Sequence, residues 1–86
     1  MALHCHDFVE TYTGLVGYGL DRPTDQATLA VYLQKVSDDA CVKRLLERMS
    51  QEEMDRLFDE LSGLLRRHFS EPEYHALFLK DGGHEF

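Results

Sequence analysis

The densest group of side chains able to do chemistry lies at the amino terminus. His4, Cys5, His6 and Asp7 follow one another there, so two imidazoles flank a thiol. Imidazole and thiolate groups are ligands for zinc and copper. The cluster of His4, Cys5 and His6 therefore indicates metal binding or metal sensing as one function of the chain, with Cu, Ni or Zn as the ion.

The first residues also indicate which ions such a site would take. Removal of Met1 would leave Ala2-Leu3-His4 at the terminus, and this arrangement resembles the amino-terminal copper- and nickel-binding motif. The resemblance covers three residues and implies a square plane of the terminal amine, two backbone nitrogens and an imidazole. In the opposing interpretation, which we favour, His4 and His6 are frayed polar residues and Cys5 packs at the start of a helix.

The remaining thiol and imidazole groups are scattered along the chain. Cys41, His75 and His84 complete no zinc-finger spacing with the amino-terminal cluster. Cys41 is expected on the buried face of a helix, where a thiol behaves as a small apolar group. No oxyanion site supports a nucleophile pair of Cys41 with His68 or His75, so we predict that the protein is not an enzyme.

A glycine-rich segment and a run of carboxylates could also be interpreted as sites. The segment Gly14-Leu15-Val16-Gly17-Tyr18-Gly19 has the glycine order of neither a dinucleotide-binding loop nor a P-loop. Close packing or helix termination explains its glycines better. The acidic residues between positions 52 and 60 accompany no Glu-x-x-His pattern, so we expect them to face solvent.

The elements that hold these residues are predicted to be helices. Apolar spacings of three and four predict a first helix from about residue 5 to Gly17 or Gly19, after which residues 21–23 form a turn. A second helix is expected from an N-cap at Thr24, and a third from an N-cap at Ser37. The apolar face of the second helix is predicted to consist of Ala27, Leu29, Ala30, Leu33 and Val36.

Two later helices carry the clearest start signals. Ser50-Gln51-Glu52-Glu53 and Ser70-Glu71-Pro72-Glu73 both have the pattern of a capping box. The first of these helices has acidic residues near its start and arginines near its end, as the helix dipole favours. The second is expected to pass through Phe78 and to end at Asp81-Gly82-Gly83. Residues 50–63 and 70–83 are similar when aligned without gaps. We interpret this similarity as two helices that follow the same capping and packing rules, and an internal duplication stays open as the alternative.

No strand signal competes with these helices, so the predicted fold class is all-α. Eighty-six residues bury a single core, which predicts a compact bundle of four to five short helices in one domain, residues 1–86. Residues 1–4 and 82–86 are predicted to be frayed tails. The chain is therefore expected to fold as one small helical unit.

The net charge and the cysteine content indicate which classes of partner and which cellular compartment to expect. Nine basic against sixteen acidic residues give a net charge of −7, which disfavours nucleic acid and anionic membrane surfaces. Two cysteines form no disulfide framework, so a reducing cytoplasm is the predicted location. We also expect no export signal and no membrane span, because no apolar stretch reaches the necessary length.

These observations favour a non-enzymatic module that needs no cofactor and acts by packing. It would serve as an accessory protein that docks a protein partner or a second copy of itself. Metal binding through the amino-terminal cluster is the alternative. The predicted interface residues are Leu57, Phe58, Leu61, Tyr74 and Phe78.

Overall fold

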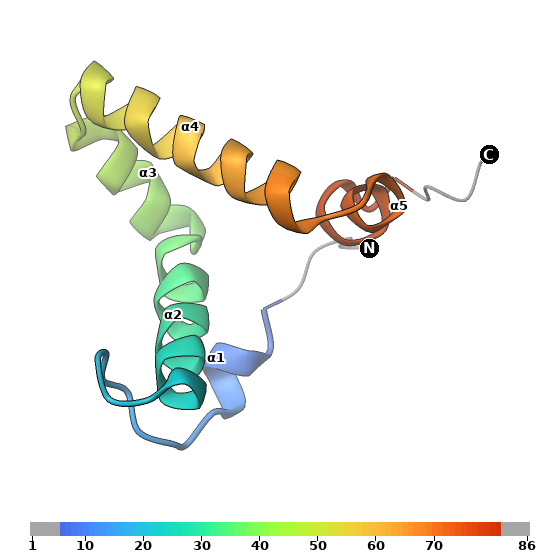
Figure 1. The fold of residues 1–86 in the computed structure, drawn as a ribbon. Coiled ribbons are helices and arrows are strands. Elements are labelled where there is room, and N and C mark those ends of the chain that lie inside the picture. Colours follow the sequence, from blue (N-terminus) through green and yellow to red (C-terminus); the bar gives the residue numbers. More distant parts are fainter. Residues whose placement is uncertain (1–5, 82–86) are drawn as a thin grey trace. The chain divides into compact units, whose positions relative to one another are not determined.

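The computed structural model describes residues 6–81, and they form helices without a strand in that range (Figure 1). The predicted all-α class is thereby confirmed. These residues divide into two units, 6–48 and 49–81, and the prediction of a single domain stays a prediction. The predicted tails lie outside the described residues. The helices are α1 (Phe8–Thr11), α2 (Arg22–Val36), α3 (Asp39–Arg48), α4 (Gln51–His68) and α5 (Glu71–Glu73), which continues as the π-helix η1 (Tyr74–Leu79).

Helix α1 is much shorter than the sequence predicts. It ends at Thr11, because Tyr12 is already extended, and the expected end near Gly17 or Gly19 is wrong. The β-branched threonines and the glycines that follow give little helix propensity to this segment. The Tyr12 hydroxyl donates to the carbonyl oxygen of Leu15 at 2.8 Å, and the Tyr12 ring fills the space that a side chain at Gly14 would need. An irregular segment therefore follows α1 in place of the expected helix.

Helix α2 begins three residues earlier than predicted. Asp21, not Thr24, is its N-cap: the Asp21 Oδ1 accepts from the backbone N–H of Thr24 at 2.9 Å. Pro23 lies in the first turn, where its missing N–H costs no hydrogen bond. The hydrogen bonds from Thr24 hold the pKa of the Asp21 carboxyl below its usual value of 3.8, because they stabilise the ionised form. The expected turn at residues 21–23 is thus the start of α2.

This cap makes the start of α2 sensitive to acid. Because the pKa of Asp21 is lowered in the folded state, its stabilising effect is present above pH 3.8 and is lost as the pH falls through the folded-state pKa. We expect helicity monitored by circular dichroism to fall less between neutral and acid pH in Asp21→Asn, which caps without titrating, than in the unmodified chain. Identical acid titrations of the two proteins would contradict this role of Asp21.

The buried side of α2 differs from the predicted one. Thr28 and Val31 are buried, with exposed fractions of 4% and 6%, whereas Leu29, Leu33 and Val36 are exposed. The Gln34 side chain accepts from the backbone N–H of Val9 at 2.8 Å and so connects α1 to α2. The predicted apolar face of α2 is therefore wrong for these three residues, and α1 packs against the opposite side.

The glycine-rich segment is fastened to the same side of α2. The Thr28 hydroxyl donates to the carbonyl oxygen of Gly17 at 3.1 Å and accepts from the Gly17 N–H at 3.0 Å. The Asp25 carboxylate accepts from the N–H of Gly19 at 2.8 Å. Gly19 has a φ of +94°, a conformation that favours glycine. The backbone conformation therefore explains Gly19, whereas close packing explains neither glycine: a side chain at Gly19 would meet no atom within 4 Å, and one at Gly17 would make only an ordinary contact of 3.6 Å.

Helix α3 is capped by a different residue from the one predicted. Ser37 ends α2 and its backbone N–H donates to Leu33, so it does not start α3. Asp38 takes this role, because its Oδ2 accepts from the backbone N–H of Cys41 at 3.2 Å. Aspartate and serine are comparable N-caps, and the two are adjacent in the sequence. The expected Ser37 cap is therefore wrong by one residue.

Both predicted capping boxes in residues 49–81 are confirmed. The Ser50 Oγ accepts from the Glu53 N–H at 3.1 Å, and the Glu53 carboxylate accepts from the Ser50 N–H at 2.9 Å. Ser70 and Glu73 form the same reciprocal pair at 3.3 and 2.8 Å. The hydrogen bonds from Ser70 also lower the pKa of the Glu73 carboxyl. The starts of α4 and α5 are consequently fixed by local sequence.

The last helix widens after its first turn. Residues 74–79 have π-helical hydrogen bonding, and the helix ends where Lys80 adopts a left-handed conformation with a φ of 53°. The His75 Nδ1 lies 3.0 Å from the Asp81 Oδ2, six positions further on. The expected end at residues 81–83 comes slightly too late, and Gly82 and Gly83 lie outside the described residues.

Candidate interaction surface

An apolar face of α4 is the candidate interaction surface that the predicted interface residues indicate in residues 49–81. Three of the predicted interface residues share it: Leu57, Phe58 and Leu61 have exposed fractions of 42%, 71% and 45%. They follow one another at spacings of one, three and four residues, which places them on one side of a helix. The α4 face, as we call it, consists of Met54, Leu57, Phe58, Leu61 and Leu64.

Charge is distributed asymmetrically along α4. Residues 51–60 contain five carboxylates and one basic residue, Arg56. Residues 61–68 contain no carboxylate but end in Arg66, Arg67 and His68. Each sign lies at the end of the helix where the dipole stabilises it. The α4 face is therefore bordered by an acidic half and a basic half.

The other two predicted interface residues form a pair of stacked rings. The centroids of Tyr74 and Phe78 lie 5.2 Å apart with an angle of 15° between the ring planes. Phe78 is exposed and Tyr74 is half-buried. Tyr74 also lines a hollow of about 380 Å³ at the end of α4, so its ring has less free surface than the sequence indicates. The hollow is lined by Ser62, Leu65, Arg66, Phe69, Ser70, Glu71 and Tyr74.

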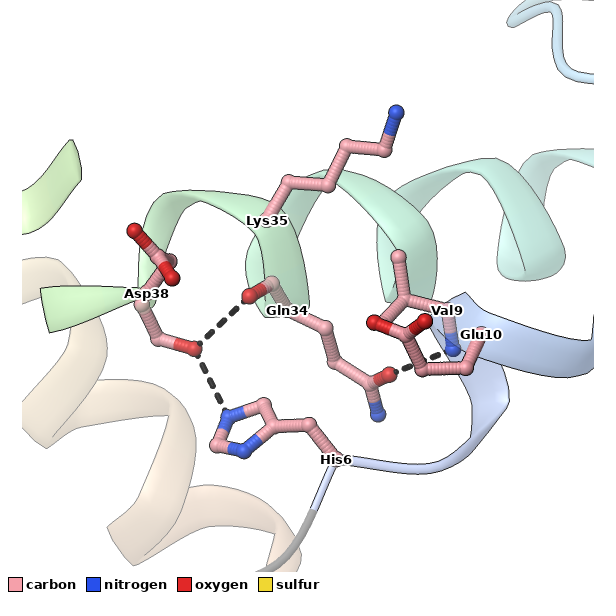
Figure 2. A pocket seen from close by; sticks show the side chains of 7 residues that line it. His6, Val9, Glu10, Gln34, Lys35 and Asp38 are labelled. Carbon is pink, nitrogen blue, oxygen red and sulfur yellow. Dashed lines mark hydrogen bonds between the residues drawn. The ribbon is translucent and has the colours of Figure 1, made fainter. Parts of the chain in front are cut away.

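The amino-terminal cluster is described only in part. His4 and Cys5 lie outside the described residues, so metal binding there stays a prediction. The His6 Nε2 lies 2.7 Å from the Ser37 Oγ, which in turn donates to the carbonyl oxygen of Gln34 (Figure 2). Within residues 6–81, no three His, Cys, Asp or Glu side chains are grouped in a way that could hold a metal ion.

The surroundings of His6 form an open polar hollow of about 570 Å³ in residues 6–48. Glu10, Lys35 and Asp38 are among the residues that line it, and the Lys35 side chain extends away from His6 (Figure 2). This hollow could not be predicted from the sequence, because α1 and the end of α2 are separated by more than twenty residues and share no motif. The hollow brings carboxylates and an imidazole into one region without forming a recognisable catalytic arrangement.

Cys41 occupies a different environment from the one predicted. Its side chain is exposed, so the expected burial on the core face of α3 is wrong. The helix starts one residue later than the Ser37 cap implies, and Asp38 binds the Cys41 backbone at the exposed first turn. His68 lies in the other unit, and the structure gives Cys41 no histidine partner within residues 6–48.

The glycine-rich segment has its amide groups already engaged. The backbone N–H groups of Gly17, Gly19 and Leu20 donate to Thr28 or Asp25 of α2. A phosphate-binding loop requires such N–H groups to point at the ligand. A carboxylate beside this loop would also repel a phosphate. The N–H groups of Gly17, Gly19 and Leu20 are therefore already engaged and do not point at a ligand.

Comparisons with family models, with curated proteins and with solved structures give no match to this chain. Among the helices of residues 6–81, none combines the length and the apolar character that crossing a membrane requires.

Proposed function

We propose that this chain is a non-enzymatic interaction module that docks a protein through the α4 face. One observation carries the proposal: α4 has apolar side chains at the spacing of a packing surface, yet they remain exposed. Phe58 leaves most of its ring in solvent. Burying one such side chain contributes roughly 1.5–3 kcal/mol, so a complementary surface would bind it readily.

The composition of the α4 face suits a protein partner. Its leucines, methionine and phenylalanine match the apolar anchors by which an amphipathic helix docks in a groove or on another helix. Carboxylates border half of this face, and the net charge of the chain is −7, so nucleic acid is a poor partner. Together with the small number of cysteines, these features favour an accessory role in the cytoplasm.

A photo-reactive residue in place of Phe58 tests the proposal in cells. We expect ultraviolet light to join the full chain to one or a few defined protein bands, a second copy of this chain included. The same residue in place of Asp59, the neighbouring position on α4, serves as the matched control and should give far weaker bands. Equal labelling from positions 58 and 59 would contradict a docking role of the α4 face.

A further inference from the structure

We infer that the occupant of the α4 face is a second copy of this chain, with the two α4 helices antiparallel. The inference rests on the proposed function and names its partner. Two observations carry it: the spacing of the apolar residues and the separation of charge along α4. Each observation concerns the single helix α4.

The spacing fits side-by-side packing with another helix. Met54, Leu57, Leu61 and Leu64 are separated by three, four and three residues, the alternation that lets two helices interlock. In an antiparallel pair centred near Asp59, Leu57 would lie opposite Leu61 of the second copy. Met54 would then lie opposite Leu64, and both apolar rows would be covered along their length.

The charges select the antiparallel orientation. A parallel pair would place the acidic half of α4, with its five carboxylates, beside the same half of the other copy. An antiparallel pair instead places the acidic half beside Arg66, Arg67 and His68 of the second copy. The dipoles of the two helices then also point in opposite directions, which is favourable. Glu53 of each copy would lie beside Arg67 of the other copy, which gives two symmetric pairs of opposite charge. One like-charged pair, Glu60 with Glu60, would remain near the axis.

The same geometry accounts for the most exposed residue of the α4 face. Phe58 flanks the apolar row close to the two-fold axis, on the side opposite Glu60. The two copies of Phe58 would therefore meet there and cover each other. Aromatic pairs of this kind add to the stabilisation from burial. A ring that is exposed in one chain would become the centre of the contact between two chains.

Light scattering on the full chain tests self-association. We expect a mass of about 20 kDa at micromolar concentrations, twice the 10.0 kDa of one chain. Leu61→Glu should restore the single-chain mass, whereas Leu29→Glu, at a similarly exposed leucine of α2, should leave the dimer intact. Circular dichroism of both variants checks that the helices persist. A single-chain mass for the unmodified protein, or a dimer that only Leu29→Glu disrupts, would overturn the inference.

Cross-linking tests the orientation. In a background with Cys5→Ser and Cys41→Ser, a short bismaleimide should join two copies of Glu60→Cys but not two copies of Arg67→Cys. In the antiparallel pair the two positions 67 are about 24 Å apart along the helix axis, at 1.5 Å per residue. A parallel pair would join both variants equally, and that result would overturn the proposed orientation.

These results separate this inference from the proposed function. A chain that remains monomeric, while a photo-reactive residue at position 58 labels a different protein, would overturn self-association and leave the docking role of the α4 face in place. Loss of position-specific labelling together with a monomeric mass would overturn both.

Discussion

Replacing Val31 by aspartate is expected to unfold residues 6–48. Val31 is the buried apolar side chain of the described residues, with an exposed fraction of 6%. A carboxylate there would lose its hydration without gaining a partner, at a cost of about 4 kcal/mol. A unit of this size has little stability in reserve. Circular dichroism and the dispersion of amide resonances would measure the loss.

The matched control lies two positions further along α2. Leu33→Asp introduces the same charge at an exposed site, where surface substitutions change stability by a few tenths of a kcal/mol. We expect Leu33→Asp to keep both the helical signal and the dispersed resonances. Equal unfolding by the two variants would contradict the assignment of the Val31 side of α2 as the buried one.

Replacing Thr28 by valine is expected to release the glycine-rich segment from α2. Valine keeps the shape of threonine, but it removes the hydroxyl that both donates to and accepts from Gly17. The Gly17 N–H and carbonyl groups would lose these partners in a half-buried place, which costs about 2 kcal/mol. Urea unfolding would measure this loss, and faster amide exchange at Gly17 would locate it.

Thr28→Ser provides the control for this second prediction. Serine retains the hydroxyl and loses only a methyl group, so we expect protection of the Gly17 amide to persist. A similar loss of protection in the serine and valine variants would indicate that the methyl group, and not the hydrogen bonds, holds the segment in place.

The starts of α4 and α5 could be predicted because their caps are local. A serine and a glutamate three residues apart satisfy each other's backbone groups whatever surrounds them. The α4 part of the candidate surface followed from the same helix, since its apolar spacing is regular. At α2, by contrast, both Asp21 and Thr24 are acceptable caps, and Pro23 in the first turn suits the earlier start.

The buried side of α2 could not be predicted from spacing. Residues 29–33 are all apolar, so periodicity leaves the inward direction undetermined. The observed buried side of α2 is the one that binds Gly17 and Val9, which are distant from α2 in the sequence. The pair of His75 and Asp81 could not be predicted either, because Asp81 lies beyond the end of the helix, after the left-handed Lys80, and helix periodicity does not apply there.

The reciprocal caps of α4 bear on the free energy with which a partner can bind this helix. A helix that is held at its first turn by Ser50 and Glu53, and further by the Gln51–Asp55 hydrogen bond, has less conformational entropy to lose when a partner arrives. Less of the binding free energy is then spent on ordering the backbone. Association through α4 should therefore resemble the docking of a preformed rod, with side-chain rotamers as the main degrees of freedom still to be fixed.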